Sequence, residues 1–198
     1  PGGPGGLGDA GARLPVILAV AKLKPQKDFA PLVAAFAEAR RHRPLRLLVL
    51  GEGEQREMLV RLAASLGVAT DVEIPGFAAN PFAYMARATM LVQTSRWEGF
   101  SNVVAEALAC GCPVVATDCP GGTREILAGG RYGRLAGVGD VRAIATAILA
   151  TLDEAPPRDE LRRRAEDFAV GAAVERYLEV LAGCLEHESR EASRPGTH

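Results

Sequence analysis

The sequence predicts an α/β domain built on a doubly wound parallel sheet. Short apolar segments of strand length alternate along the chain with longer segments that carry apolar residues at helical spacing. The strand segments are apolar almost throughout, which is typical of strands that are buried on both faces. In such sheets ligands bind beyond the carboxyl ends of the strands, so we expect a site in the loops that follow them.

Residues 1–13, PGGPGGLGDAGAR, are rich in glycine and proline without periodicity and predict a flexible linker. A folded domain is expected over residues 14–187. It begins with a β-branched, apolar strand at 15–21 and a helix over 28–43, with Asp28 as the N-cap of that helix. The alternation continues with a strand at 45–50, a helix at 54–66 that ends at Gly67, and a short strand at 72–74.

The second half of the domain repeats this alternation. A loop from Thr94 to Phe100 separates a strand at 89–93 from a helix at 101–110, which Gly111 ends. The other elements expected here are helices at 81–87 and 123–128, strands at 113–117 and 133–136, and helices at 139–153 and 158–187. The polar residues 188–198 are expected to form a disordered tail.

Composition restricts the class of protein. With 198 residues, 48% of them hydrophobic and 24% charged, the chain can bury a sizeable core. The net charge of −1 and the aromatic content of 5% argue against a nucleic-acid partner. The longest apolar run, over residues 14–21, is too short to cross a bilayer.

The four cysteines have the spacing of neither a zinc site nor a secreted disulfide framework: Cys110, Cys112, Cys119 and Cys184. Reduced thiols fit a cytoplasmic protein, and no charged and apolar leader precedes the domain. Because the chain starts at Pro1 without a methionine, we expect it to be a piece of a longer protein.

The segment from Trp97 to Asp118 holds the candidate chemistry. Between Gly99 and Thr117 its only charged residue is Glu106, which therefore requires a polar partner or a polar cleft. Glu98 precedes Glu106 by eight positions, in the loop just before the helix. Ser101 and Asn102 are good N-caps, so free backbone amides are expected to face this loop and to attract anions.

Two carboxylates beside an amide cluster suit an elongated ligand that has hydroxyl groups at each end and a negative group between them. A nucleoside diphosphate sugar has that layout. Its phosphates need cations, and three lysines follow the first strand in the loop KLKPQKD: Lys22, Lys24 and Lys27. The turn Gly51-Glu52-Gly53 is not a nicotinamide fingerprint, because Arg56 occupies its third glycine position. Gly121-Gly122 fits either close backbone approach to a ligand or a tight turn.

Three segments, in order, resemble the C-terminal domain of retaining GT-B glycosyltransferases of the family-4, or group 1, type. They are AKLKPQKDFAPLVAAFA, LVLGEGEQREML, and NPFAYMARATMLVQTSRWEGFSNVVAEALACGCPVVATDCPGGTREIL with the following GRLAGVGD. The resemblance spans residues 14–181, and the string EGFSNVVAEALACGCPVV is its most specific part. It implies a Rossmann-like domain that binds the nucleotide sugar without a metal ion or other cofactor.

The resemblance also assigns roles to residues. Glu98 is implied as the catalytic carboxylate that contacts the donor sugar, and Glu106 as the partner of the ribose hydroxyls. Lys22 and Lys27 are implied to grip the diphosphate, and Gly76-Phe77 to border the base. The remaining donor-binding candidates lie around the start of the 101–110 helix: Gly99, Phe100, Ser101, Asn102 and Val103.

This sequence departs from the family at two places. The family usually has Gly-Arg at Ala21-Lys22 and Lys-Gly at Lys27-Asp28, and lysine lacks the two-pronged hydrogen-bonding geometry of arginine. The run SNVVAEALACG followed by DCPGGTREIL is most similar to members that use uridine diphosphate sugars on polysaccharide or lipid-linked acceptors.

A complete GT-B enzyme has two Rossmann-like domains, so this chain is expected to be the donor-binding half. The acceptor site, and any peripheral membrane contact, would then belong to the missing N-terminal half. Two alternatives remain open: a nucleotide-sugar epimerase of the same architecture, and a catalytically silent module that only binds nucleotide sugars.

Overall fold

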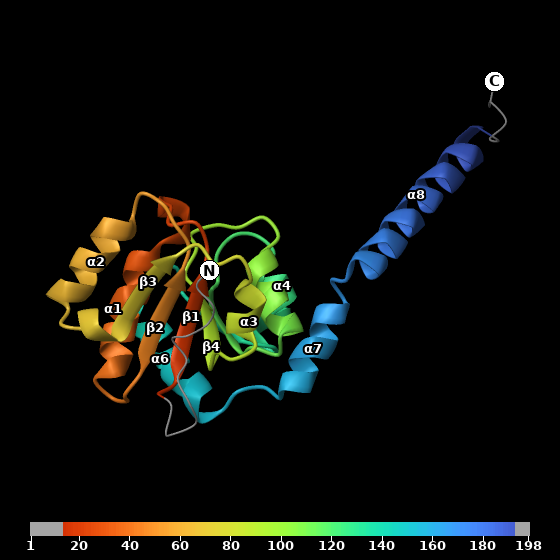
Figure 1. Cartoon of the computed structure of the whole chain (residues 1–198). Helices are drawn as coiled ribbons and strands as arrows, with labels where there is room; N and C mark the ends of the chain where they lie inside the picture. The colour runs from red at the N-terminus through yellow and green to blue at the C-terminus, as the bar shows by residue number, and fades with distance from the viewer. Residues whose placement is uncertain (1–13, 193–198) are drawn as a thin grey trace.

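A computed structural model describes residues 14–192 and confirms the predicted fold class (Figure 1). Six strands form one sheet in the order β3-β2-β1-β4-β5-β6, and every neighbouring pair is parallel. The strands are β1 (Val16–Val20), β2 (Arg46–Leu50), β3 (Val72–Gly76), β4 (Met90–Gln93), β5 (Val114–Thr117) and β6 (Arg134–Ala136). This order is the doubly wound, Rossmann-like arrangement.

Helices cover both faces of the sheet and enclose a separate core on each. The first face carries α1 (Phe29–Arg40), α2 (Arg56–Ser65) and α6 (Val141–Asp153). The second face carries α3 (Pro81–Met85), α4 (Asn102–Ala109), α5 (Thr123–Ile126) and α7 (Arg158–Glu166). β4 and β5 are buried along their whole length, which explains why their sequences are apolar up to the last residue rather than alternating.

The strand order reverses between β1 and β4, which are neighbours in the middle of the sheet. The loop after β1 and the loop after β4 therefore leave the same edge of the sheet side by side. The first loop contains the short 3-10 helix Pro25–Lys27, and the second contains Glu98. A crevice at such a switch point is where ligands bind in open α/β sheets.

The GEG turn after β2 supports the loop that follows β1. A Cβ atom on Gly51 would lie 1.8 Å from the carbonyl oxygen of Ala21, and the φ angle of Gly51 is +145°. The amide of Leu23 donates to the Glu52 carbonyl at 2.8 Å. These contacts give the glycine turn a structural role that is independent of any dinucleotide motif, since only glycine permits this close approach.

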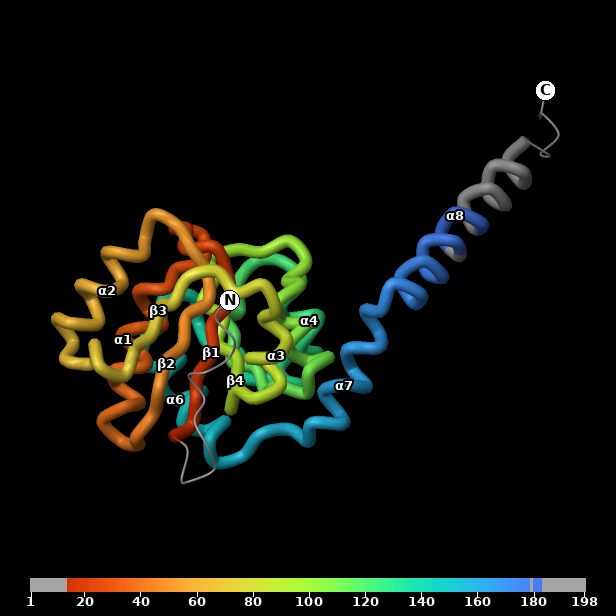
Figure 2. Tube along the Cα trace, in the orientation of Figure 1, coloured from red at the N-terminus to blue at the C-terminus, as the bar shows by residue number. Residues whose placement is uncertain are grey.

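The C-terminal region differs from the predicted single helix over 158–187. It consists of α7 and a second helix, α8 (Val170–Ala192), which points away from the sheet (Figures 1 and 2). The chain turns at 167–169, where the Phe168 ring packs against Phe100 with centroids 5.5 Å apart. The tail predicted from residue 188 begins inside α8, which continues to Ala192. The predicted linker, 1–13, and residues 193–198 lie outside the described residues.

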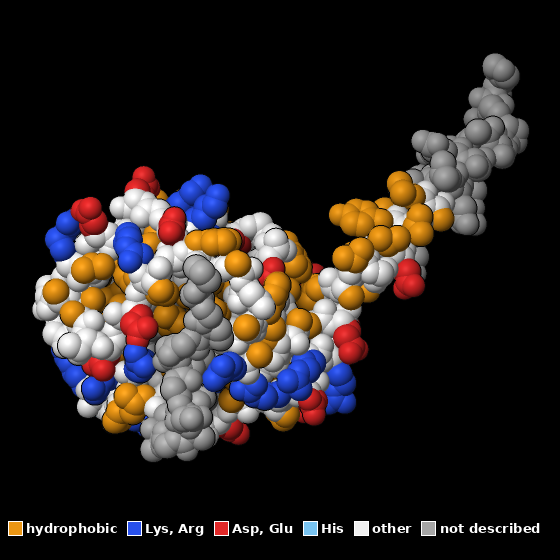
Figure 3. Space-filling view, viewed as in Figure 1, with side chains coloured by type: hydrophobic (Ala, Val, Ile, Leu, Met, Phe, Trp, Pro, Cys, Tyr) orange, Lys and Arg blue, Asp and Glu red, His pale blue; other side chains and the backbone are white. Residues whose placement is uncertain are grey.

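Large apolar side chains remain exposed along α8, on the face shown in Figure 3. They lie at helical spacing: Val170, Val174, Tyr177, Leu178 and Leu181. No helix within the described part of the chain is both long enough and apolar enough to cross a membrane.

We expect Gly51→Ala to destabilise the domain because a methyl group there collides with backbone. Gly67→Ala is the matched control, since Gly67 also has a positive φ but no atom within 4 Å of its Cβ position. The control should cost about 1–2 kcal/mol of unfolding free energy through backbone strain alone. Gly51→Ala should cost about 1–3 kcal/mol more. Urea unfolding measures both values, and equal losses would contradict the supporting role of the turn.

Candidate functional site

Glu98 is the centre of the candidate site, and three donors converge on one oxygen of its carboxylate. The Lys27 ammonium lies 2.6 Å from Oε1, and the Gln93 amide and the Ser95 hydroxyl donate to the same oxygen at 2.9 and 2.5 Å. The Glu98 side chain is only 8% exposed. A carboxylate that is this deeply buried needs such partners, because an unpaired one is costly. Lys27 and Glu98 are 71 positions apart in the sequence, and the fold brings them into contact.

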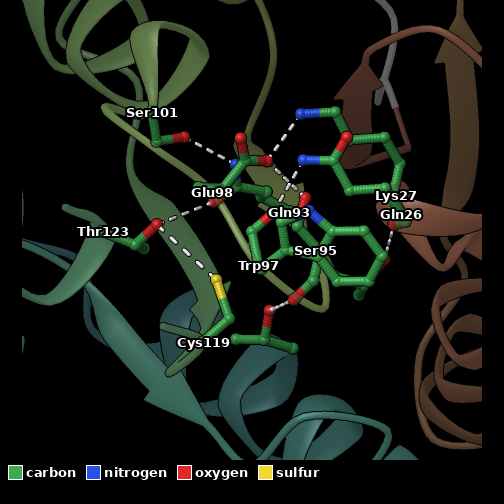
Figure 4. A network of polar contacts seen from close by, with 11 residues as sticks. Gln26, Lys27, Gln93, Ser95, Trp97, Glu98, Ser101, Cys119 and Thr123 are labelled. Carbon is green, nitrogen blue, oxygen red and sulfur yellow. Dashed lines mark hydrogen bonds and ion pairs between the residues drawn. The ribbon is translucent and has the colours of Figure 1, made fainter. Parts of the chain in front are cut away.

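A buried network continues behind Glu98, as Figure 4 shows. The Gln93 amide nitrogen also donates to the Ser101 hydroxyl at 2.6 Å, and Thr123 donates to the Gln93 carbonyl oxygen at 3.5 Å. Cys119 lies 4.0 Å from the Thr123 hydroxyl, and burial raises the pKa of the Cys119 thiol. This thiol therefore stays protonated at neutral pH and adds no second negative charge beside Glu98.

Three further hydrogen bonds join the loop after β1 to the loop after β4. The amide of Arg96 donates to the Gln26 carbonyl at 2.9 Å, and the Gln26 side chain donates to the Trp97 carbonyl at 2.8 Å. Thr94 donates to the Lys27 carbonyl at 3.1 Å. The two loops that carry the lysine and the carboxylate are thus joined by these hydrogen bonds as well as by the ion pair.

Asp28 begins α1 as predicted, but its side chain does not cap the helix. Its carboxylate instead pairs with Arg96 at 3.1 Å, which adds another link between the two loops. The φ angle of Asp28 is +47°, in the left-handed region that favours glycine. Glycine, which the resembling family usually has at this position, adopts such a φ angle without strain. Aspartate is one of the few other residues that tolerate it.

Gly121 and Gly122 hold the Glu98 loop from its other side. The amide of Glu98 donates to the Pro120 carbonyl at 2.9 Å, and the amide of Gly122 donates to Gly99 at 2.8 Å. A Cβ atom on Gly121 would lie 1.8 Å from the carbonyl oxygen of Glu98. The backbone that approaches these glycines is therefore that of the Glu98 loop.

Glu106 lies on α4 and is half-buried. No hydrogen bond or ion pair reaches its carboxylate from the described residues. The charge-poor helix therefore presents a carboxylate without a protein partner, in contrast to the fully bonded Oε1 atom of Glu98. The sequence predicted that Glu106 needs a partner or a polar cleft, and the described residues supply no hydrogen-bonding or ion-pair partner for it.

The start of α4 differs from the prediction in one respect. Ser101 occupies the N-cap position, but its hydroxyl makes no capping bond and accepts from Gln93 instead. The amides of Asn102 and Val104 donate to the carbonyls of Phe100 and Ser101, both at 3.1 Å. Within the described chain, the amide of Val103 has no acceptor, so this backbone donor remains available to an anion.

The other predicted residues lie at the same edge of the sheet. Lys22 is exposed in the loop after β1, and Phe77, just past the end of β3, is 78% exposed. Gly76 is buried, and a Cβ atom there would lie 3.0 Å from a carboxylate oxygen of Glu52. Gly99 and Asn102 are exposed around the start of α4. Phe100 is half exposed and packs on Phe168, a contact that the sequence did not predict.

A separate hollow in the described structure lies away from these residues. It measures about 660 Å³ between β6 and α6, where Arg134, Asp140 and Thr146 line it. None of the predicted site residues borders it, and it lies away from the switch point between β1 and β4. The paired Lys27 and Glu98 side chains lie instead at the switch point of the sheet, so the Glu98 region remains the candidate site. No group of three or more potential metal ligands occurs within residues that the structure describes.

Comparison with known proteins identifies the family. The model of the family "Glycosyl transferases group 1" matches residues 14–154. The chain belongs to this family. It is 34% identical over 153 residues to the Campylobacter jejuni N-acetylgalactosamine-N,N'-diacetylbacillosaminyl-diphospho-undecaprenol 4-alpha-N-acetylgalactosaminyltransferase. It is 37% identical over 153 residues to the GDP-mannose-dependent alpha-(1-6)-phosphatidylinositol monomannoside mannosyltransferase of Mycolicibacterium smegmatis.

The structural likeness agrees with this assignment. The crystal structure of Anabaena Alr3699/HepE in complex with UDP matches with a TM-score of 0.76 and 25% identity, over 86% of this chain and 49% of that one. The two enzymes named above match over 77% and 72% of this chain, but over only 41% and 39% of their own lengths. The chain thus spans about two fifths of these relatives.

The contact between Lys27 and Glu98 should be measurable as an energetic coupling. We expect a double-mutant cycle of Lys27→Met and Glu98→Gln to give about 1–3 kcal/mol in urea unfolding, because both side chains are largely buried. Arg61 and Glu57 form a control pair that is 73% and 84% exposed, and their coupling should be close to zero. Equal couplings for the two pairs would contradict the arrangement described for the site.

Proposed function

We propose that this chain is the donor-binding half of a retaining glycosyltransferase that takes a hexose-type sugar from a nucleoside diphosphate sugar. The observation that carries the proposal is the convergence of Lys27 and Glu98 at the switch point of the sheet. A cation for phosphate and a carboxylate for sugar hydroxyls lie in contact there, on two loops that are distant in sequence. Membership of the group 1 family supports this assignment.

The residue roles follow from this arrangement and from the family resemblance. Lys27 and Lys22 grip the diphosphate, with the free amide of Val103 as a further donor. Glu98 contacts the sugar, and Glu106 receives the ribose hydroxyls. The lysines supply the positive charge that a metal ion provides at other phosphate sites, so we expect binding to need no metal.

We favour uracil as the base of the donor nucleotide. The complex of Anabaena HepE with UDP supports it. The Mycolicibacterium relative is described as GDP-mannose-dependent, so both bases occur among proteins similar to this one. The segment Gly76-Phe77 lies where we place the base, with Glu52 beside it.

The acceptor is proposed to be a glycan or a lipid-linked glycan. The name of the Campylobacter relative includes a diphospho-undecaprenol-linked sugar, which supports this class of acceptor. We place the acceptor site on a further domain, in keeping with the share of the relatives' length that this chain spans. The exposed apolar face of α8 supports such a neighbour, since large apolar patches mark interfaces. The complete protein would act in the cytoplasm, with contact to the membrane through its acceptor.

The two alternatives have less support. The relatives named above are transferases, and neither an epimerase nor a silent binding module is among them. The paired carboxylates are intact, with Glu98 fully supported by its neighbours, which is unnecessary in a module that only binds nucleotides. Epimerised product formed without any acceptor would favour the epimerase, and donor binding without turnover would favour the silent module.

We expect Lys22→Ala and Lys27→Ala each to weaken UDP binding by about 1–3 kcal/mol, because each removes a charge-assisted bond to phosphate. Uridine without phosphate should bind both variants as it binds the original chain. Calorimetry of this chain with both ligands measures the difference, and added EDTA should leave UDP binding unchanged. Equal losses for UDP and uridine would argue against a phosphate grip.

Substitutions of the two carboxylates should have different kinetic effects in the full-length enzyme. Glu98→Gln should lower kcat more than donor affinity, because its contacts are with the reacting sugar. Glu106→Ala should weaken donor binding, and a 2′-deoxyribose donor should then lose little further affinity. Steady-state kinetics with both donors makes the comparison. If removal of the 2′-hydroxyl group lowers donor affinity as much in Glu106→Ala as in the unchanged enzyme, Glu106 does not contact the ribose.

A further inference from the structure

We propose that Gln93 is a positioning residue that orients Glu98 so that its second carboxylate oxygen, Oε2, faces the donor sugar. The inference rests on the proposed function for the role of Glu98, but its geometric part stands on the structure alone. Gln93 is the last residue of β4 and is 7% exposed. It carries no charge and cannot itself act as an acid, a base or a nucleophile at neutral pH.

The Gln93 side chain uses both of its amide hydrogens. One points to Glu98 Oε1 at 2.9 Å, and the other points to the Ser101 hydroxyl at 2.6 Å. A flipped amide would turn the Gln93 carbonyl oxygen toward the carboxylate, and two acceptors would then face each other without a hydrogen. The orientation in the structure is therefore the one that chemistry requires.

All the donors act on the same side of the carboxylate. Lys27, Ser95 and Gln93 all reach Oε1, and no donor from the described residues reaches Oε2 (Figure 4). Lys27 and Ser95 lie on loops, whereas Gln93 is the last residue of a strand in the central sheet. Without Gln93, the carboxylate plane could tilt about Oε1 while Oε1 keeps its bonds to the lysine and the serine, and Oε2 would then lose its fixed direction.

A purely structural role is the competing explanation. Gln93 joins β4 to the start of α4 through Ser101 and to the start of α5 through Thr123, so its loss could simply loosen both helices. A structural role predicts a lower melting temperature and fewer active molecules. A positioning role predicts slower turnover in each molecule that still binds donor.

The kinetic test compares Gln93→Met with Thr151→Val in the full-length protein. Methionine keeps the length of glutamine without its hydrogen bonds, and Gln93→Asn, which shortens the amide, is a second variant in case the first does not fold. Thr151 is equally buried but lies in α6, where it bonds only to the Ala147 carbonyl. With kcat expressed per donor-binding site from calorimetry, we expect Gln93→Met to lower kcat about 10- to 100-fold. The donor KM should change less than about threefold, and Thr151→Val should change neither constant. A kcat for Gln93→Met within threefold of that of Thr151→Val would overturn the proposal.

The geometric test uses NMR on the ¹⁵N-labelled chain and needs no catalysis. Glu98→Ala should shift the resonance of one Gln93 side-chain hydrogen, and Ser101→Ala should shift the other, whereas Thr151→Val should move neither. If the Gln93 side-chain resonances do not shift in Glu98→Ala, the proposal is also overturned. If the full-length protein transfers no sugar while the NMR pattern is found, the proposed function fails and the hydrogen-bond geometry stands.

Discussion

The organisation of the site depends on one constraint, the need to satisfy a nearly buried carboxylate. Glu98 is 8% exposed and carries a negative charge, so its loop is stable only where donors surround it. Lys27 supplies the compensating charge from the loop after β1, and this makes the two central loops of the sheet a single unit. Gln26 accepts from the Arg96 amide with its backbone carbonyl and donates to the Trp97 carbonyl with its side chain, and these two bonds hold that unit in register.

Two glycines allow neighbouring turns to pack closely against the two loops that carry Lys27 and Glu98. Gly51 lets the turn after β2 press against the loop of Lys22, and Gly121 lets the turn after β5 press against the loop of Glu98. In each case a Cβ atom would overlap a carbonyl oxygen at 1.8 Å. The loops that carry the charged side chains are thus supported by backbone on either flank, which orders them before any ligand arrives.

The sequence predicted the elements whose signal is periodic or continuous, and it missed features that depend on single tertiary contacts. Strands β4 and β5 were predicted because burial on both faces favours an unbroken apolar run over most of each strand. The turn at 167–169 was missed because Phe168 meets Phe100, a partner distant in sequence. Gln93 was missed for the same reason, since a single amide at a strand end has no pattern until Glu98 and Ser101 fold onto it. Glu98 and Glu106 could be singled out because charge is rare in their segment.

The two carboxylates differ in a way that their spacing alone does not reveal. Glu98 has its Oε1 atom fully engaged by protein donors, whereas the Glu106 carboxylate has no partner within the described residues. A group that is already bonded loses little freedom when substrate binds and keeps a fixed direction, which suits a residue at a reacting centre. A group without a partner gains its hydrogen bonds only from the ligand, which suits a residue that supplies affinity. Under the proposed function, the two ends of the site therefore differ before the donor binds. The end near Glu98 is already ordered by protein hydrogen bonds, and the end near Glu106 gains its hydrogen bonds from the nucleotide.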